Sequence, residues 1–126
     1  MRLPSGRLLR YPYPEVQNTM RYNKPVKKLT FRSEIKGKWV REGSYGGKLV
    51  ENLVQGIARD LMVNGCFNAE AKGYAVVGTV HDELITLVDE GFGSAEELVD
   101  IVRLKPVWST DCPVNAEGWS GKRYRK

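Results

Sequence analysis

Three adjacent residues that could bind a metal ion or transfer protons, His81-Asp82-Glu83, interrupt an apolar stretch between Ala75 and Val88. Burying two neighbouring carboxylates without partners would cost several kcal/mol or shift their pKa values. A reversal of the chain at the triplet avoids this cost, because the two apolar halves can pair as strands while the acids face water. Carboxylates on such a rigid bend suit a hard divalent cation, which prefers oxygen ligands. The stretch predicts a hairpin at about 74–88 with a metal-binding bend.

The turn of this hairpin carries no strong sequence signal of its own. Neither Asn-Gly nor Gly-Gly stands between the two apolar halves, although such pairs mark many two-residue turns. Periodicity alone would equally allow one continuous strand. We expect the bend because it exposes the charges.

A long helix is predicted at about 47–63, ahead of the hairpin. Apolar residues recur there at helical spacing, and a polar line that includes Gln55 falls on the opposite side. Ser44 is a suitable N-cap, and Asn64-Gly65 is a suitable stop. The polar line by itself is typical of a solvated helix face.

A second helix is predicted at about 94–104, after the hairpin. Ser94-Ala95-Glu96-Glu97 has the form of a capping box, and Pro106 ends the helical pattern. A strand at about 114–119 would then complete an antiparallel sheet. Together these elements predict an α+β fold in which two helices pack on an antiparallel sheet.

The N-terminal segment, residues 1–43, is rich in turn and strand signals. Residues 7–11 could form a strand, closed by the prolines that follow. Residues 27–32 and 38–41 flank a bend at which Gly37 relieves the backbone, and this pattern predicts a basic hairpin.

The charge of the chain is strongly divided along its length. Residues 1–48 hold twelve Lys or Arg against three acids, residues 49–120 hold four against twelve, and residues 121–126 add four bases. A basic surface beside an acidic site suits a protein that grips phosphates near a metal, although a solvated basic arm would look the same. The candidate phosphate contacts on the basic hairpin, which could equally be protective charges on an edge strand, are Lys27, Lys28, Arg32, Lys36 and Lys38.

The length of 126 residues predicts one domain, with a basic segment at 1–43, a core at 44–120 and a basic tail at 121–126. No long apolar run suits a membrane crossing, and the N-terminus has no signal-peptide pattern. Cys66 and Cys112 are not spaced as metal ligands and are expected to be reduced. The expected location is therefore the cytoplasm.

Four segments resemble parts of family A DNA polymerases, the class of bacterial DNA polymerase I and many phage replicases. Along the chain, they follow one another in the order that the family has. Val80-His81-Asp82-Glu83-Leu84 resembles the C-motif of the family, and Gln55-Gly56-Ile57-Ala58-Arg59-Asp60 is similar to a signature on a palm helix. Residues 3–9 resemble the segment after the fingers helices, and residues 117–126 resemble the C-terminal end of phage-type members. The resemblance covers nearly the whole chain, and it implies the cytoplasm of a bacterial or phage-infected host cell.

This resemblance implies roles for individual residues in nucleotidyl transfer to a primer 3′ end by a two-metal mechanism. Asp82 would bridge the metal ions, Glu83 would be a secondary ligand, and His81 would contact the primer terminus or orient the neighbouring chain. Gln55 and Arg7 would contact DNA. The implied cofactor is Mg²⁺, and the implied partners are a DNA primer-template and a deoxynucleoside triphosphate.

Parts of the family pattern are absent from this sequence. Nothing matches the A-motif, which supplies the other catalytic aspartate, or the fingers helix that grips the nucleotide. We therefore expect a C-terminal palm portion that is inactive alone and holds Mg²⁺ weakly or not at all. A chain with the remaining palm, fingers and thumb is a possible partner, and uncovered apolar faces favour self-association. The alternatives are a DNA-binding remnant, an accessory subunit of a split replicase and, less favoured, a metal-dependent hydrolase.

Overall fold

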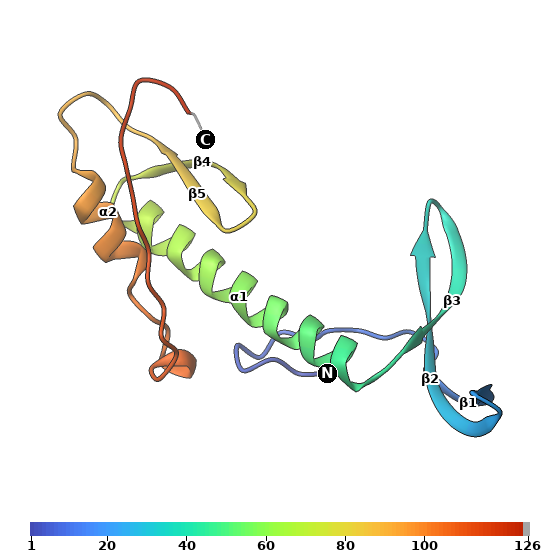
Figure 1. Cartoon of the computed structure of the whole chain (residues 1–126). Coiled ribbons are helices and arrows are strands. Elements are labelled where there is room, and N and C mark those ends of the chain that lie inside the picture. The colour runs from blue at the N-terminus through green and yellow to red at the C-terminus, as the bar shows by residue number, and fades with distance from the viewer. Residues whose placement is uncertain (125–126) are drawn as a thin grey trace. The chain divides into compact units, whose positions relative to one another are not determined.

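The computed structural model of the chain describes residues 1–124 and contains two helices and two antiparallel sheets, which confirms the α+β class (Figure 1). Arg125 and Lys126 of the predicted basic tail lie outside the described residues. The chain divides into two compact units, Met1–Ile57 and Ala58–Lys126. Helix α1 (Gly46–Ala71) begins in the first unit and ends in the second. None of the helices within the described residues has the length and hydrophobicity of a membrane span.

The first unit contains a three-stranded antiparallel sheet, which we name the meander. Its strands are β1 (Glu15–Arg21), β2 (Lys24–Ile35) and β3 (Lys38–Ser44), in the order β1-β2-β3. The predicted basic hairpin is confirmed as β2 and β3, whereas β1 was not predicted.

Two tight turns connect the strands of the meander. Tyr22 and Asn23 have φ angles of 50° and 58°, and Lys36 and Gly37 have φ angles of 51° and 75°. Two consecutive left-handed residues are typical of the turns whose twist matches that of paired strands. Asn and Gly adopt this conformation most easily, so they account for the second position of each turn.

The predicted strand at residues 7–11 is wrong. The chain instead folds back on its first residues: the amide of Leu3 donates to the Arg7 carbonyl at 2.8 Å, and that of Leu9 donates to the Met1 carbonyl at 2.8 Å. Gly6, with a φ angle of 89°, permits this tight loop. Leu3 is buried by the loop.

Ser44 is not the N-cap of α1. The helix begins at Gly46, and the Tyr45 carbonyl accepts the first helical hydrogen bond, from the Leu49 amide at 3.1 Å. Ser44 is the last residue of β3, and its buried hydroxyl has no hydrogen-bond partner among the described residues.

The predicted end of α1 at residue 63 is also wrong, because Asn64 and Gly65 serve tertiary packing. Asn64 Nδ2 donates to the Leu104 carbonyl at 2.8 Å. This carbonyl lies just beyond the end of α2, where backbone carbonyls have no partner within the helix. A Cβ atom at Gly65 would lie 3.1 Å from a methyl group of Val102. The glycine thus lets the two helices approach, and α1 continues to Ala71, where Gly73 (φ 88°) ends it.

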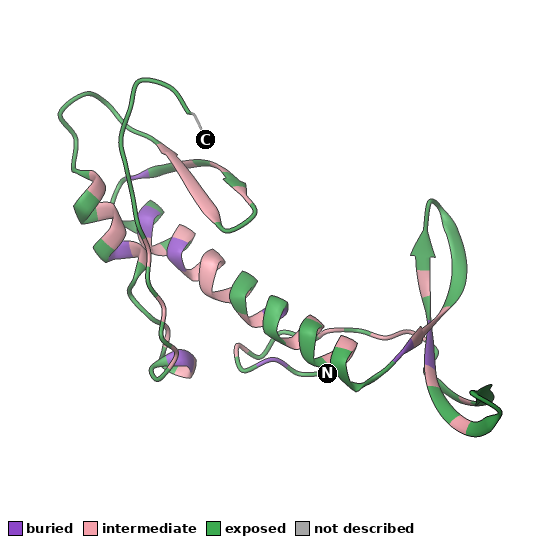
Figure 2. Cartoon of the chain, in the orientation of Figure 1, coloured by how far each residue is buried: buried purple, intermediate pink, exposed green. Residues whose placement is uncertain are grey.

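The second unit packs a hairpin and a short helix against the last turns of α1. The hairpin consists of β4 (Ala75–Val80) and β5 (Glu83–Leu87), and it is followed by α2 (Ala95–Val102) and a 3-10 turn at Val107–Ser109. Figure 2 shows buried positions of this unit where α1, α2 and the start of β4 meet, and a further one in the 3-10 turn. The core cluster there contains Ala69, Tyr74, Ile101 and, partly buried, Val76, Leu84 and Leu98.

The predicted capping box of α2 is half confirmed. The Ser94 hydroxyl accepts a hydrogen bond from the Glu97 amide at 3.1 Å, as an N-cap should. The Glu97 carboxylate does not return to the Ser94 amide; it accepts the Tyr74 hydroxyl proton at 2.7 Å. Tyr74 in turn accepts from the Ser94 amide at 3.2 Å, so the phenol completes the cap. The helix ends at Val102, two residues before the predicted end.

The predicted closing strand at 114–119 is wrong as well, because this segment runs along α2. Arg103 Nη2 donates to Asn115 Oδ1 at 2.5 Å and to the Ala116 carbonyl at 2.8 Å. A Cβ at Gly118 would lie 2.7 Å from a Val99 methyl group, which places the segment in direct contact with the helix. Arg103 therefore supplies two acceptors of this segment with a hydrogen bond without a sheet.

Tyr74 gives the second unit a defined pH dependence. Burial, and then the hydrogen bond with Glu97, raise the pKa of Tyr74 above its ordinary value of 10.0. The folded chain therefore keeps this proton to higher pH than the unfolded chain, and the contribution to stability is lost as pH rises above about 10. In denaturant titrations between pH 9 and 11, we expect the Tyr74→Phe variant to lose less stability with pH than the unaltered chain. Parallel losses in the two proteins would contradict this assignment.

Candidate functional site

The bend of the β4–β5 hairpin carries His81 and Asp82, and the predicted reversal is confirmed. Val80 pairs with Glu83, so the two residues between them form the whole turn. Both are exposed, and His81 has a left-handed φ angle of 55°. A non-glycine residue in this conformation is uncommon. The chain thus places an imidazole and a carboxylate side by side in water.

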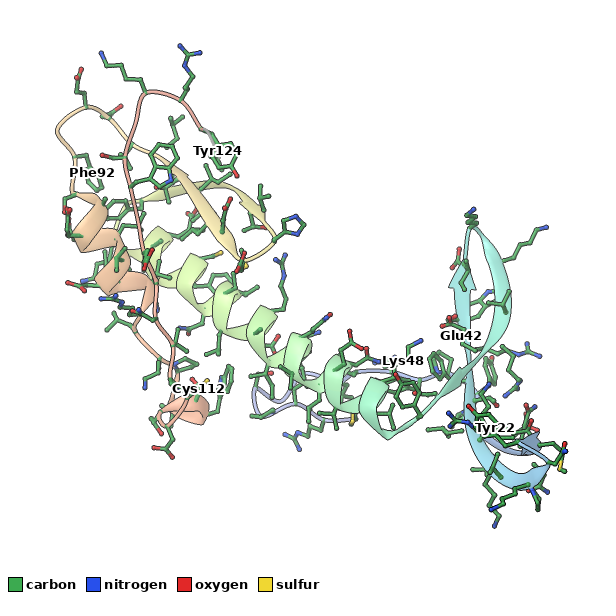
Figure 3. All side chains as sticks on the ribbon, in the orientation of Figure 1. Tyr22, Glu42, Lys48, Phe92, Cys112 and Tyr124 are labelled. Carbon is green, nitrogen blue, oxygen red and sulfur yellow. The ribbon has the colours of Figure 1, made fainter. Side chains whose placement is uncertain are left out.

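Glu83 differs from its two neighbours, because it is the first residue of β5 and is half-buried. The Tyr124 hydroxyl donates a hydrogen bond to Glu83 Oε2 at 2.5 Å, and Figure 3 shows Tyr124 beside the β4–β5 hairpin. The hydrogen bond with Glu83, and then burial, raise the pKa of Tyr124. One Glu83 oxygen is thus engaged, while the other has no hydrogen bond to a described residue.

Leu84 positions the two carboxylates. Successive side chains of a strand point to opposite faces, and Leu84 packs against the core cluster together with Val76. Glu83, one residue earlier, is therefore directed to the opposite face of the hairpin. The apolar contacts of one face anchor the turn that presents Asp82.

The acids at this bend do not form a complete metal site. Within residues 1–124, no three side chains of His, Cys, Asp or Glu gather as a group that could hold a metal ion. Asp82 and Glu83 are two adjacent oxygen donors, the type that Mg²⁺ prefers, but this ion needs near-octahedral coordination. Cys66 and Cys112 are free cysteines and are half-buried.

Gln55 and Arg7, the predicted DNA contacts outside the basic hairpin, both lie in the first unit. Gln55 is exposed on α1, and its side-chain amide donates to Glu51 Oε1 at 3.5 Å. The Arg7 guanidinium donates to the Gly56 carbonyl at 3.0 Å, so it ties the N-terminal loop to the helix. Gly56 is buried, and a Cβ there would lie 3.1 Å from a methyl group of Leu3.

The five basic residues of the predicted hairpin do not share one surface. Directly paired residues of antiparallel strands point to the same face, and neighbours along a strand point to opposite faces. The observed register therefore places Lys28 and Arg32 on one face of the meander and Lys27 and Lys38 on the other, with Lys36 in a turn. Because side chains alternate between the two faces of a strand, the predicted strand was enough to assign Lys27 and Lys28 to opposite faces.

Sequence patterns missed other residues of these surfaces. Arg21 and Lys24 pair across the β1–β2 turn, and they were missed because β1 was not predicted. The sequence signal that could have revealed the β1–β2 turn is Asn23, because asparagine tolerates the left-handed backbone of a two-residue turn. The bond between Tyr124 and Glu83 joins residues 41 positions apart and has no local signal.

The whole chain is similar to part of a DNA polymerase. The relative is the DNA polymerase of Bacillus phage SP02, which is 35% identical to the chain over 127 residues, covering 100% of the chain. The match covers 19% of that polymerase, so the chain spans about a fifth of the length of the curated relative it matches. No protein-family model matches the chain, and no solved structure matches it.

Proposed function

We propose that the chain is the C-terminal palm portion of a family A DNA polymerase and takes part in template-directed nucleotidyl transfer to a primer 3′ end. The observation that carries this proposal is the exposed His81-Asp82 turn between two paired strands, in a chain similar to part of a phage DNA polymerase. The His-Asp-Glu order at this turn is the order of the family's C-motif.

Each residue of the triplet has a role in this proposal. Asp82, exposed and rigidly supported, would hold a divalent ion, and Glu83 would be a secondary ligand through the oxygen not bonded to Tyr124. When bound, Mg²⁺ would supply the charge that offsets the developing negative charge on the reacting oxygens. His81 would donate a hydrogen bond at the primer terminus. Gln55 would contact primer or template from α1.

Exposed apolar side chains support the proposal that the chain works within a larger assembly. Val50 and Val54 on α1 are each 58% exposed, and Phe67 and Leu87 are each 70% exposed. Large exposed apolar patches usually mark interaction sites. The rest of a polymerase, in the same chain or in a separate subunit, would cover such positions, and it would supply the missing ligands.

A second candidate function is DNA binding without catalysis. The observation that favours it is the lack of a three-ligand metal group among the described residues, together with the basic residues of the meander. A chain of this kind would bind DNA as an accessory subunit or as a remnant of a polymerase.

A chimera separates the two candidates. The matched segment of the phage SP02 polymerase is replaced by residues 1–126, and primer extension is measured with Mg²⁺. We expect the chimera to extend the primer and the isolated chain to show no extension, because the isolated chain lacks the A-motif aspartate. A folded chimera that binds primer-template but never extends it would favour the second candidate. Extension by the isolated chain that is lost in Asp82→Ala would overturn the expectation of inactivity.

A further inference from the structure

The meander has two chemically different faces. The register assigns Lys28, Arg32 and Arg41 to one face together with Glu15 and Trp39. Phe31, Leu29 and Val40 belong to the opposite face, as does Glu42, which is labelled in Figure 3. Observed side-chain contacts agree with this division. Arg41 Nη1 bonds to Thr30 Oγ1 at 3.0 Å on the first face, and the Ser33 hydroxyl bonds to Glu42 Oε2 at 2.8 Å on the second.

Four exposed basic side chains make up what we name the basic face: Arg21, Lys24, Lys28 and Arg32. Arg41 is excluded because it forms an ion pair with Glu15 at 2.9 Å. Lys24 and Lys28 form no ion pair with any residue between 1 and 124. The only unpaired acid that the register places on this face, within the described residues, is Glu34.

Three side chains of the basic face lie against neighbouring groups. The Lys28 stem passes over Gly43 of β3, where a Cβ atom would lie 2.0 Å from Lys28 Cε. The Arg32 guanidinium lies 5.4 Å from the centre of the Tyr13 ring, and that of Arg21 lies 5.5 Å from the centre of the Tyr22 ring. Stacked guanidinium groups keep their N–H edges available to oxygen acceptors.

The length of the basic face is comparable to most of one turn of a DNA duplex. At about 3.4 Å per residue, the eight steps from Lys24 to Arg32 span roughly 27 Å. Duplex DNA carries one phosphate per strand every ~3.4 Å of its axis, so about eight phosphates of one strand fall within that length. The four cations can therefore contact several phosphates of one duplex.

We propose that the basic face of the meander binds the sugar–phosphate backbone of duplex DNA, and that Lys27 and Lys38 take no part. This inference rests on the proposed function for its choice of DNA, and it adds a surface and two residues, Arg21 and Lys24, to that function. Phosphate contacts of this kind position a duplex without reading its sequence.

Two double variants with the same net charge test the proposal. Fluorescence anisotropy with a labelled duplex is measured for the full chain, for Lys28→Ala/Arg32→Ala and for Lys27→Ala/Lys38→Ala. We expect the first variant to bind roughly tenfold or more weakly at 50 mM salt, and its slope of log affinity against log salt to be shallower by about 1.8. The matched control should stay within about twofold of the unaltered chain.

A second variant of the same face, Arg21→Ala/Lys24→Ala, should weaken binding in the same way, and circular dichroism should show all variants folded. Equal losses for the two faces would mean that net charge alone governs binding, and this would overturn the proposal. Failure of the unaltered chain to bind the duplex would overturn it too. Primer extension by the chimera, which tests the proposed function, can succeed or fail independently of these results.

Discussion

Replacing Asp82 with Asn in the chimera should lower the rate of primer extension on the order of 10³-fold, or about 4 kcal/mol of transition-state stabilisation. The Asn side chain has nearly the same size but lacks the negative charge that would hold the divalent ion. Because Asp82 lies exposed in a two-residue turn, its replacement should leave the hairpin and its apolar contacts intact. Single-turnover extension of a labelled primer measures the effect.

The matched control for this variant is Asp89→Asn. Asp89 is an exposed acid shortly after β5, outside the candidate site, so its rate should stay within about twofold of the unaltered chimera. Glu83→Gln should lower the rate of extension less than Asp82→Asn does, on the order of tenfold, because Glu83 is proposed to be a secondary ligand of the metal ion. Extension by Asp82→Asn at the rate of the Asp89 control would exclude Asp82 from the reaction.

Replacing Ile101 with Ala should lower the free energy of unfolding by about 2–5 kcal/mol, the range expected for removing a buried branched side chain. Ile101 lies in the core cluster with Ala69 and Tyr74, where α2 packs on the hairpin. Since the same core anchors Leu84, the loss should also disturb the turn that carries Asp82. Urea denaturation followed by circular dichroism measures the change.

Val107→Ala is the control for this stability measurement. Val107 is 92% exposed, so its truncation should change the free energy of unfolding by no more than about 0.5 kcal/mol. If the two variants lost equal stability, the core cluster would not be what holds the second unit together.

The hairpin at the candidate site could be predicted from sequence because electrostatics constrains it strongly. Two adjacent carboxylates within an apolar run leave few acceptable conformations, and a reversal at His81-Asp82 is the least costly. The exposure of Asp82 follows from the same reasoning. The split of the triplet, with Glu83 inside β5, depends on a one-residue difference in register that the composition of the turn does not determine.

The length of α1 could not be predicted from local signals. Asn64-Gly65 resembles a helix stop, but Asn64 caps the segment after α2 and Gly65 provides room for Val102. Both functions depend on a helix about forty residues away in the chain. The absence of a strand at 114–119 also depends on a contact outside the segment, because the Arg103 side chain donates to Asn115 Oδ1 and to the Ala116 carbonyl.

The basic hairpin was correctly located from sequence, but its residues were grouped without regard to the faces of a strand. Lys27 and Lys28 are neighbours in sequence and point to opposite sides of β2. Lys27 lies on the face that carries Phe31, whereas Lys28 belongs to the basic face. The alternative of protective charges on an edge strand is wrong for both lysines, because β2 is the central strand of the meander. The partner strand β1 shows how wide that basic face is, since it adds Arg21 beside Lys24.

The most direct test of the central claim, that Asp82 holds a divalent ion during nucleotide addition, is a metal-specificity switch in the chimera. Asp82→Cys replaces a hard oxygen ligand with sulfur, which binds Mg²⁺ poorly and softer ions better. We predict almost no extension with Mg²⁺ and a substantial recovery with Mn²⁺, while Asp82→Ala recovers with neither ion. The same residual activity for the Cys and Ala variants with both ions would contradict direct ligation by Asp82.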